Sequence, residues 1–208
     1  MIGQPQTKAS ATTTGISAQR VAYEIGQLVE GEGIFAGIWE PKDRQGKSLN
    51  KKFAVFAAPE DFTDSSGKKI LLTFEAAADE LAKRKNWHGH DGGNYKNDTA
   101  LYKALKGGSY KGEWFIPTRD LLLGTDIDGN KVHEESLFKN RNEGDFAGTY
   151  TTRESSSDFA FWYWSSSEHR DHSEGVWFGR FSDGDGGWVN KDTNRLRCRP
   201  CRVVELVI

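Results

Sequence analysis

The sequence predicts an α+β fold, and three observations lead to this prediction. Residues 73–85 and 98–106 carry the apolar spacing and the end-capping residues that are typical of helices. Short apolar runs separated by Gly, Asp and Ser turns surround these helices, and they dominate the chain from residue 159 onward, as in antiparallel sheets. The 208 residues also include 7 Trp and 23 Gly, which indicates large aromatic anchors between many tight turns.

The length and composition indicate one folded domain with a polar surface. Charged residues make up 28% of the chain and the formal net charge is −2, which argues against nucleic-acid binding because that function needs a basic surface. The apolar runs are too short to cross a membrane, and no charged segment followed by an apolar one opens the chain. We therefore expect no membrane insertion and no standard signal peptide. Residues 1–17, rich in Ala, Ser and Thr, predict a flexible tail before a domain at residues 18–208.

The first part of the domain predicts a β-hairpin. Residues 33–39 (GIFAGIW) form an apolar run that is typical of a buried strand, and the polar residues 41–47 that follow are typical of a turn. Residues 52–58 supply a second short strand. We expect the two strands to pair with each other.

The first helix has clear signals at both ends. Thr73 is a suitable N-cap, Glu75 lies in the first turn, and cations end the segment, which matches the helix dipole. The apolar stripe of this helix consists of Phe74, Ala77, Ala78 and Leu81.

Two shorter elements follow. Residues 98–106 predict a helix that Asn97 caps and that stops at the pair Gly107 and Gly108. A short strand at residues 114–116 precedes Thr118, where we expect a third helix to begin.

The C-terminal part of the chain predicts strands only. Residues 126–157 are polar and Gly-rich and are interpreted mostly as loop. Residues 161–166 and 176–182 predict two strands, and residues 183–187 (DGDGG) predict a turn. Residues 196–208 supply one or two more strands.

Alternation along residues 176–182 suggests a binding face. Trp177, Gly179 and Phe181 share one face of this strand, whereas Val176 and Phe178 share the other face with Arg180 and Ser182. Because Arg180 and Ser182 are polar, we expect the second face to be exposed or to line a site. The alternative is that protein covers both faces and that Phe178 belongs to the core.

A second alternating segment carries three arginines. Leu196 and Cys198 are expected to point inward, and Arg195, Arg197 and Arg199 are expected to point outward. Such a row of guanidinium groups suits carboxylates, phosphates or aromatic rings. The alternative is a solvated face whose Arg stems cover Trp rings.

Metal and catalytic signatures are weak in this chain. Cys198 and Cys201 form a C-x-x-C pair, but no helix-length segment follows it and no second ligand pair has a fixed spacing, so we interpret Cys198 as a small buried hydrophobe. Asp183 and Asp185 suit calcium, although Asp and Gly are also what hairpin turns require. The chain contains no phosphate-binding Gly loop, dinucleotide fingerprint or nucleophile motif. We therefore expect no cofactor and no enzymatic activity.

The order of the motifs resembles a known family. The motifs are the Gly-rich strand at residues 26–35, the helix at 73–85, WFIPT at 114–118, YWSSSE at 163–168, VWFGRFSDG at 176–184 and LRCR at 196–199. Together they resemble the C-type-lectin-like domain found in the C-terminal family of bacterial collagen-like adhesins. They look still more like the variable proteins that retroelements diversify in phages and bacteria. The resemblance covers residues 20–208.

This resemblance implies a fold and a site. The fold would be a C-type-lectin-like α+β domain in which two helices flank a twisted antiparallel sheet and the N- and C-terminal strands pair. A variable region at about residues 160–200 would carry the surface that binds a protein or a surface receptor, and display on a virion or cell surface would be favoured. Trp164, Phe181, Leu196 and Cys198 would form the scaffold. The ligand-binding candidates are His172, Glu174, Phe178, Arg180, Asp185, Trp188, Asn190, Asp192, Asn194 and Arg197.

Two other functions stay open at the level of sequence. The chain could be a structural subunit of a virion or surface fibre. It could also be an enzyme of the formylglycine-generating type, which shares the lectin-like fold class and would use Cys198 and Cys201.

Overall fold

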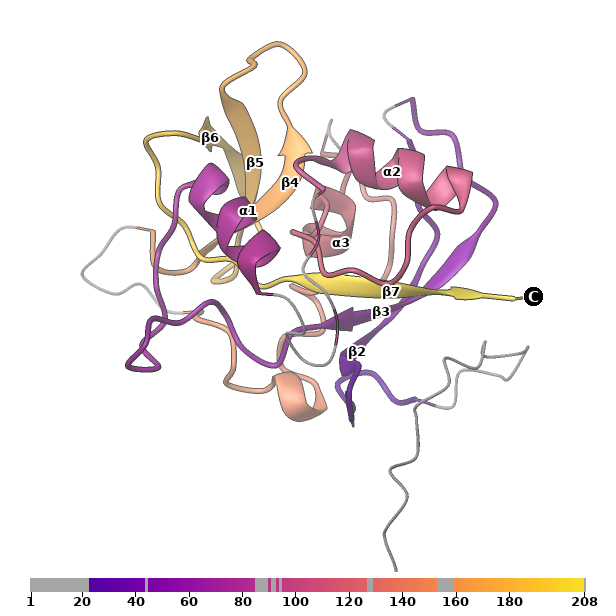
Figure 1. The fold of residues 1–208 in the computed structure, drawn as a ribbon, viewed down its shortest axis with the longest axis horizontal. Helices are drawn as coiled ribbons and strands as arrows, with labels where there is room; N and C mark the ends of the chain where they lie inside the picture. The colour runs from indigo at the N-terminus through magenta and orange to yellow at the C-terminus, as the bar shows by residue number, and fades with distance from the viewer. Residues whose placement is uncertain are drawn as a thin grey trace, which may run out of the picture.

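Two antiparallel sheets and three helices make up the protein in a computed structural model, which describes residues 23–43, 45–84, 90, 93, 95–126, 129–152 and 159–207 (Figure 1). The predicted tail at residues 1–17 lies outside the described residues. Helices and antiparallel strands are combined as expected, so the α+β prediction is confirmed.

The first sheet contains the predicted hairpin. Its strands are β1 (Leu28–Val29), β2 (Gly33–Trp39), β3 (Lys52–Ala57) and β7 (Cys201–Leu206), in the order β1-β2-β3-β7. All neighbours are antiparallel. The C-terminal strand pairs with β3, and the first described strand pairs with β2, which differs from the expected pairing of the terminal strands.

The second sheet consists of β4 (Trp162–Glu168), β5 (Gly175–Arg180) and β6 (Gly186–Asn190) in sequence order. β4 and β5 match the predicted strands. β6 begins inside the segment that the sequence predicts as a turn, because Gly186 and Gly187 pair with Gly179 and Phe178 of β5.

The helices begin where the sequence predicts, and the first of them ends two residues earlier than expected. In α1 (Phe74–Lys83) the Thr73 side chain accepts a hydrogen bond from the backbone of Ala76. In α2 (Asp98–Gly107) Asn97 plays the same part, and Gly108 ends the helix with a φ of 69°, a conformation that favours glycine. The third helix, α3 (Arg119–Leu123), has only five residues. A 3₁₀ turn, η1 (Gly144–Phe146), lies in the predicted loop.

Among the described residues, two large apolar cores hold these elements together, and a small third cluster of Phe35, Ala54 and Phe56 lies on the four-stranded sheet. One large core lies between the four-stranded sheet, α2 and α3, and includes Trp39, Phe53 and Leu122. The other large core lies between α1 and the three-stranded sheet, and includes Trp114, Trp164 and Leu196. Figure 1 shows the three-stranded sheet beside α1, with the loop between β4 and β5 extending away from the long strand β7.

A buried ion pair connects two segments that are far apart in the sequence. Arg199 is fully buried, and its Nε lies 2.7 Å from Asp61 Oδ1. Tyr163 of β4 donates a hydrogen bond to the other carboxylate oxygen of Asp61, and Thr149 accepts from the Arg199 guanidinium. The prediction that Arg199 points outward is therefore wrong, since protein covers this segment on both sides and Cys198 and Arg199 are both buried.

Candidate functional site

A column of stacked side chains crosses one end of the three-stranded sheet. We call it the aromatic column; it consists of Arg119, His169, His172, Trp177 and Trp188. Trp177 and Trp188 are cross-strand partners on β5 and β6. Both histidines come from the loop that joins β4 to β5, and the arginine is the first residue of α3.

The stacking runs continuously from the arginine outward. The Arg119 Cζ lies 3.8 Å from the centre of the Trp177 ring. His169 stacks on Trp177 with ring centres 5.5 Å apart, and its ring centre is 4.9 Å from that of Trp188. His172 lies almost parallel to Trp188, at 4.4 Å and 17°. Guanidinium and aromatic groups at such distances attract each other.

Exposure increases along the aromatic column. Arg119 is 8% exposed and Trp188 is 40% exposed. The His172 side chain is 46% exposed. The column therefore joins the buried side of the sheet to its surface, and Trp188 with His172 forms the accessible end.

Local sequence features place these groups. An irregularity in β4 between Trp164 and Glu168 turns the serine side chains onto the backbone: Ser165 Oγ donates to the carbonyl of Trp177, and Ser167 Oγ accepts from the backbone N–H of Arg119. Gly175 leaves room for the indole above it, because a Cβ there would lie 2.9 Å from Trp188 Cε3.

Acidic groups flank the accessible end. The Glu174 side chain is half exposed, and one of its oxygens lies 4.0 Å from His172 Nδ1. Asp171 is exposed in the same loop, which also carries the exposed Arg170. The nearby cation of Lys191 is engaged, since its Nζ donates to the Ser173 carbonyl and lies 3.7 Å from Glu168.

The structure brings together only some of the predicted ligand-binding residues. His172, Glu174 and Trp188 share the accessible end. Arg180 lies at the far end of β5, about 16 Å from Gly175 along the strand at the usual rise per residue. There its guanidinium pairs with Asp183 at 2.9 Å and with Asp185 at 2.7 Å.

The remaining polar candidates serve the turn after β6 and the adjoining segment. The Asn190 side chain accepts hydrogen bonds from the backbone of Asp192 and Thr193, and the Asn194 amide donates to the Asn190 carbonyl. Asp192 is exposed. Arg197 is partly exposed, and its Nε donates to the Ala160 carbonyl.

The expectation that Phe178 faces outward is wrong. Phe178 is 6% exposed and stacks on Trp162 with ring centres 4.1 Å apart and planes 2° apart. Its face of β5 packs on the core beside α1, together with Val176. The polar side chain of Arg180 does not indicate that this whole face is exposed, because Arg180 lies at the end of the strand and pairs with the aspartates of the following turn. By contrast, Trp164, Phe181, Leu196 and Cys198 are all buried, as expected of a scaffold.

Both cysteines are buried in the core. Burial raises the pKa of Cys198 and of Cys201, so both thiols stay protonated at neutral pH. A thiolate nucleophile or metal ligand needs the opposite environment. The geometry therefore favours the interpretation of Cys198 as a buried hydrophobe.

The calcium candidates Asp183 and Asp185 already face a cation. Both carboxylates converge on Arg180, whose single positive charge offsets one of their two negative charges. Within the described ranges, no three His, Cys, Asp or Glu side chains are grouped so as to hold a metal ion.

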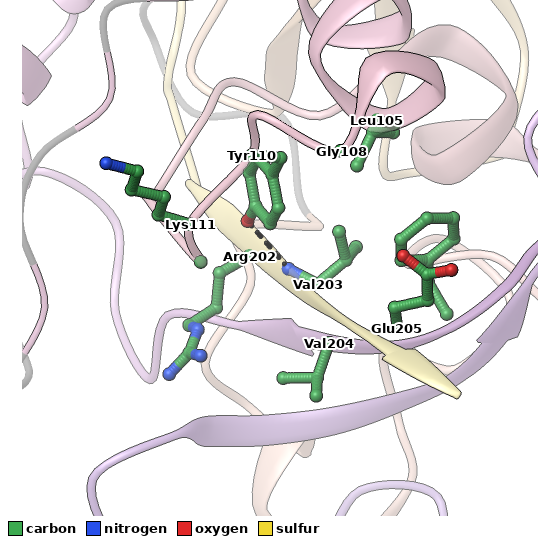
Figure 2. A pocket seen from close by; sticks show the side chains of 10 residues that line it. Leu105, Gly108, Tyr110, Lys111, Arg202, Val203, Val204 and Glu205 are labelled. Atoms are coloured by element: carbon green, nitrogen blue, oxygen red, sulfur yellow. Dashed lines mark hydrogen bonds between the residues drawn. The ribbon is translucent and has the colours of Figure 1, made fainter. Parts of the chain in front are cut away.

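A separate hollow lies beside the outer edge of β7. Figure 2 shows Tyr110, Arg202, Val203 and Glu205 around it, and the Tyr110 hydroxyl accepts a hydrogen bond from the backbone of Val203 at 3.0 Å. Its volume is about 230 Å³, below the roughly 300 Å³ at which ligand pockets usually begin. None of the predicted ligand-binding residues lines it.

Sequence reasoning missed Arg119, His169 and Trp177 as members of the column. The pairing of Trp177 with Trp188 follows from the hairpin around residues 181–185, so counting outward from that turn could have placed both on one face. Nothing in the sequence signals that Arg119 lies over Trp177, since this contact depends on how α3 packs on the sheet.

Comparison with models of protein families and with curated proteins finds no match for this chain. Among the described residues, the helices are too short and too polar for any of them to cross a membrane.

Proposed function

We propose that this protein is a non-enzymatic ligand-binding protein, and that the accessible end of the aromatic column is its binding surface. The observation that carries the proposal is the exposure of Trp188, which is 40% exposed beside the half-exposed ring of His172. Large aromatic side chains that remain accessible on a folded surface are typical anchors of protein interfaces.

The support beneath this surface suits binding. Trp188 lies on a paired strand, and its ring rests against Gly175 and His169, so little ordering entropy is lost when a ligand binds. Trp and His supply rigid contact area, and the neighbouring Glu174 supplies an adaptable polar contact.

We further propose that the α+β fold is the C-type-lectin-like fold and that exposed positions of residues 160–200 are diversified, as the resemblance implies. His172, Glu174 and Asp192 are exposed, and surface substitutions usually change the free energy of unfolding by less than about 0.5 kcal/mol. The ligand-binding side chains would then vary without disturbing the core.

The experiment is a pair of displayed libraries. One library randomises His172, Glu174, Trp188 and Asp192, and the matched library randomises Trp164, Val176, Phe178 and Leu196. We expect most members of the first library to fold, by resistance to protease, and to yield binders when selected against a purified protein such as hen lysozyme. The second library should lose resistance in most members. Equal loss in both libraries would contradict the proposal.

The DNA around the coding sequence offers an independent test. A neighbouring reverse transcriptase gene and a near-copy of the codons for residues 160–200 would support diversification. The differences between the copies should fall on His172, Glu174 and Trp188 and spare Phe178. Differences concentrated on buried residues would contradict the proposal.

A further inference from the structure

Resting on the proposed function, we infer that the accessible end of the aromatic column binds a cationic side chain, so that its partner is a protein or peptide presenting an exposed arginine. The inference deepens the proposal by naming the chemistry of the ligand. Three features of the described residues lead to it.

The first feature is an internal example of the same contact. At the buried end of the column, the Arg119 guanidinium lies over the Trp177 indole at 3.8 Å. Trp188, its cross-strand partner, belongs to the same column through His169 and is 40% exposed. A guanidinium group of a partner that packed on Trp188 would form the same cation–π contact at the surface that Arg119 forms with Trp177 in the interior.

The second feature is the charge around Trp188. The Glu174 carboxylate lies 4.0 Å from His172 Nδ1, and His172 itself stacks on Trp188. Asp171 adds a second exposed carboxylate in this loop, against the single guanidinium of Arg170. Lys191 is held by Glu168 and by the Ser173 carbonyl. An excess of carboxylates beside an accessible indole favours a cation over an anion.

The third feature is the use of the nearby amides. A sugar bound on an aromatic ring also needs polar side chains that are free to bind its hydroxyl groups. The Asn190 side chain is occupied by two backbone donors of its own turn, and the Asn194 amide donates to the Asn190 carbonyl. The oxygen of the Asn190 amide and the nitrogen of the Asn194 amide are thus used within the turn, which leaves fewer groups for sugar hydroxyls and favours a cation over a carbohydrate.

The test uses small probes and the indole N–H signals of the full chain in nuclear magnetic resonance. The Trp188 signal is assigned from its absence in Trp188→Phe. The probes are N-acetylarginine amide, the uncharged analogue N-acetylcitrulline amide, and N-acetylglucosamine. We expect the Trp188 signal to shift saturably with the arginine probe, and citrulline to bind about two- to fivefold more weakly.

Two charge-removing variants complete the test. Glu174→Gln should weaken binding of the arginine probe about two- to fivefold, whereas Glu30→Gln, which removes an exposed carboxylate from the other sheet, should leave it unchanged. Added salt should also weaken binding.

Three results would overturn the inference. Equal binding of the arginine and citrulline probes would mean that the indole binds planar groups without preference for a positive charge. Binding of the sugar alone would assign the surface to a carbohydrate. In both cases the proposed function would stand with a different ligand class. No shift with any probe would also reject the inference, and the paired libraries would then decide the proposed function separately.

Discussion

The two faces of the three-stranded sheet both carry a cross-strand pair of large aromatic side chains, yet only one pair is buried, on the face that we call the closed face. On one face, Trp164 and Phe178 are cross-strand partners and are buried against the core beside α1. On the other, Trp177 and Trp188 are cross-strand partners, and Trp188 is 40% exposed. The two pairs are of similar residue types. They differ in which part of the chain packs against them.

The length of the covering helix explains the difference. α3 has five residues, and its leucines reach only the glycines of the second face: a Cβ on Gly179 would lie 2.7 Å from Leu123 Cδ2, and one on Gly186 would lie 2.8 Å from Leu123 Cδ1. Beyond these glycines the helix begins, and its first residue, Arg119, is the part of α3 that packs on Trp177. No described helix therefore covers the outer half of this face, and the side chains of the aromatic column lie there.

The largest effect should come from the buried ion pair between Arg199 and Asp61. Asp61→Ala leaves the Arg199 guanidinium buried without its carboxylate and removes the acceptor of the Tyr163 hydroxyl. We expect a loss of about 3–5 kcal/mol in the free energy of unfolding, measured by urea denaturation. A loss below about 1 kcal/mol would show that water or other groups replace Asp61.

The next largest effect should come from the closed face itself. Phe178→Ala removes a ring that stacks on Trp162 at 4.1 Å and lines the core with Val176. We expect a loss of about 3 kcal/mol in the free energy of unfolding, again by urea denaturation. Phe178→Leu, which keeps most of the buried volume, should lose clearly less. If Phe178→Ala left the free energy of unfolding unchanged, Phe178 would not be a core residue and would again be a candidate for ligand binding.

A smaller effect should appear as the pH rises, because each of the two large cores holds a buried thiol: Cys198 beside α1 and Cys201 in β7. Burial raises the pKa of Cys198 and Cys201 in the folded protein, so the unfolded chain loses these protons first, above its ordinary thiol pKa of about 8.5. Stability is therefore full below about pH 8.5 and decreases above it, by about 2–3 kcal/mol at pH 9.5 for two thiols. Urea denaturation of the Cys198→Ala and Cys201→Ala double variant should show a smaller decrease over this pH range, and an unchanged slope would contradict the assignment.

The elements with local signals were predictable from the sequence. Thr73 and Asn97 cap α1 and α2 as expected, since capping needs only a few neighbouring residues. Features that depend on distant segments were not. Phe178 and Arg199 both follow alternating patterns that place them outside, but α1 closes over the first and Asp61 pairs with the second. His172, Glu174 and Trp188 were correctly expected to be exposed.

The smallest effect on stability should come from the accessible end of the aromatic column. It gives the most direct comparison of the two faces of the sheet. Trp188→Ala removes an indole that is 40% exposed and rests on Gly175 and His172. We expect a loss of about 1–2 kcal/mol in the free energy of unfolding, because part of the indole already contacts water in the folded protein. Trp164→Ala is the matched control, since it removes the same side chain from a fully buried position and should cost about 3–5 kcal/mol. If the two variants were equally destabilised, Trp188 would be part of the core, and the accessible end of the aromatic column would no longer differ from the closed face.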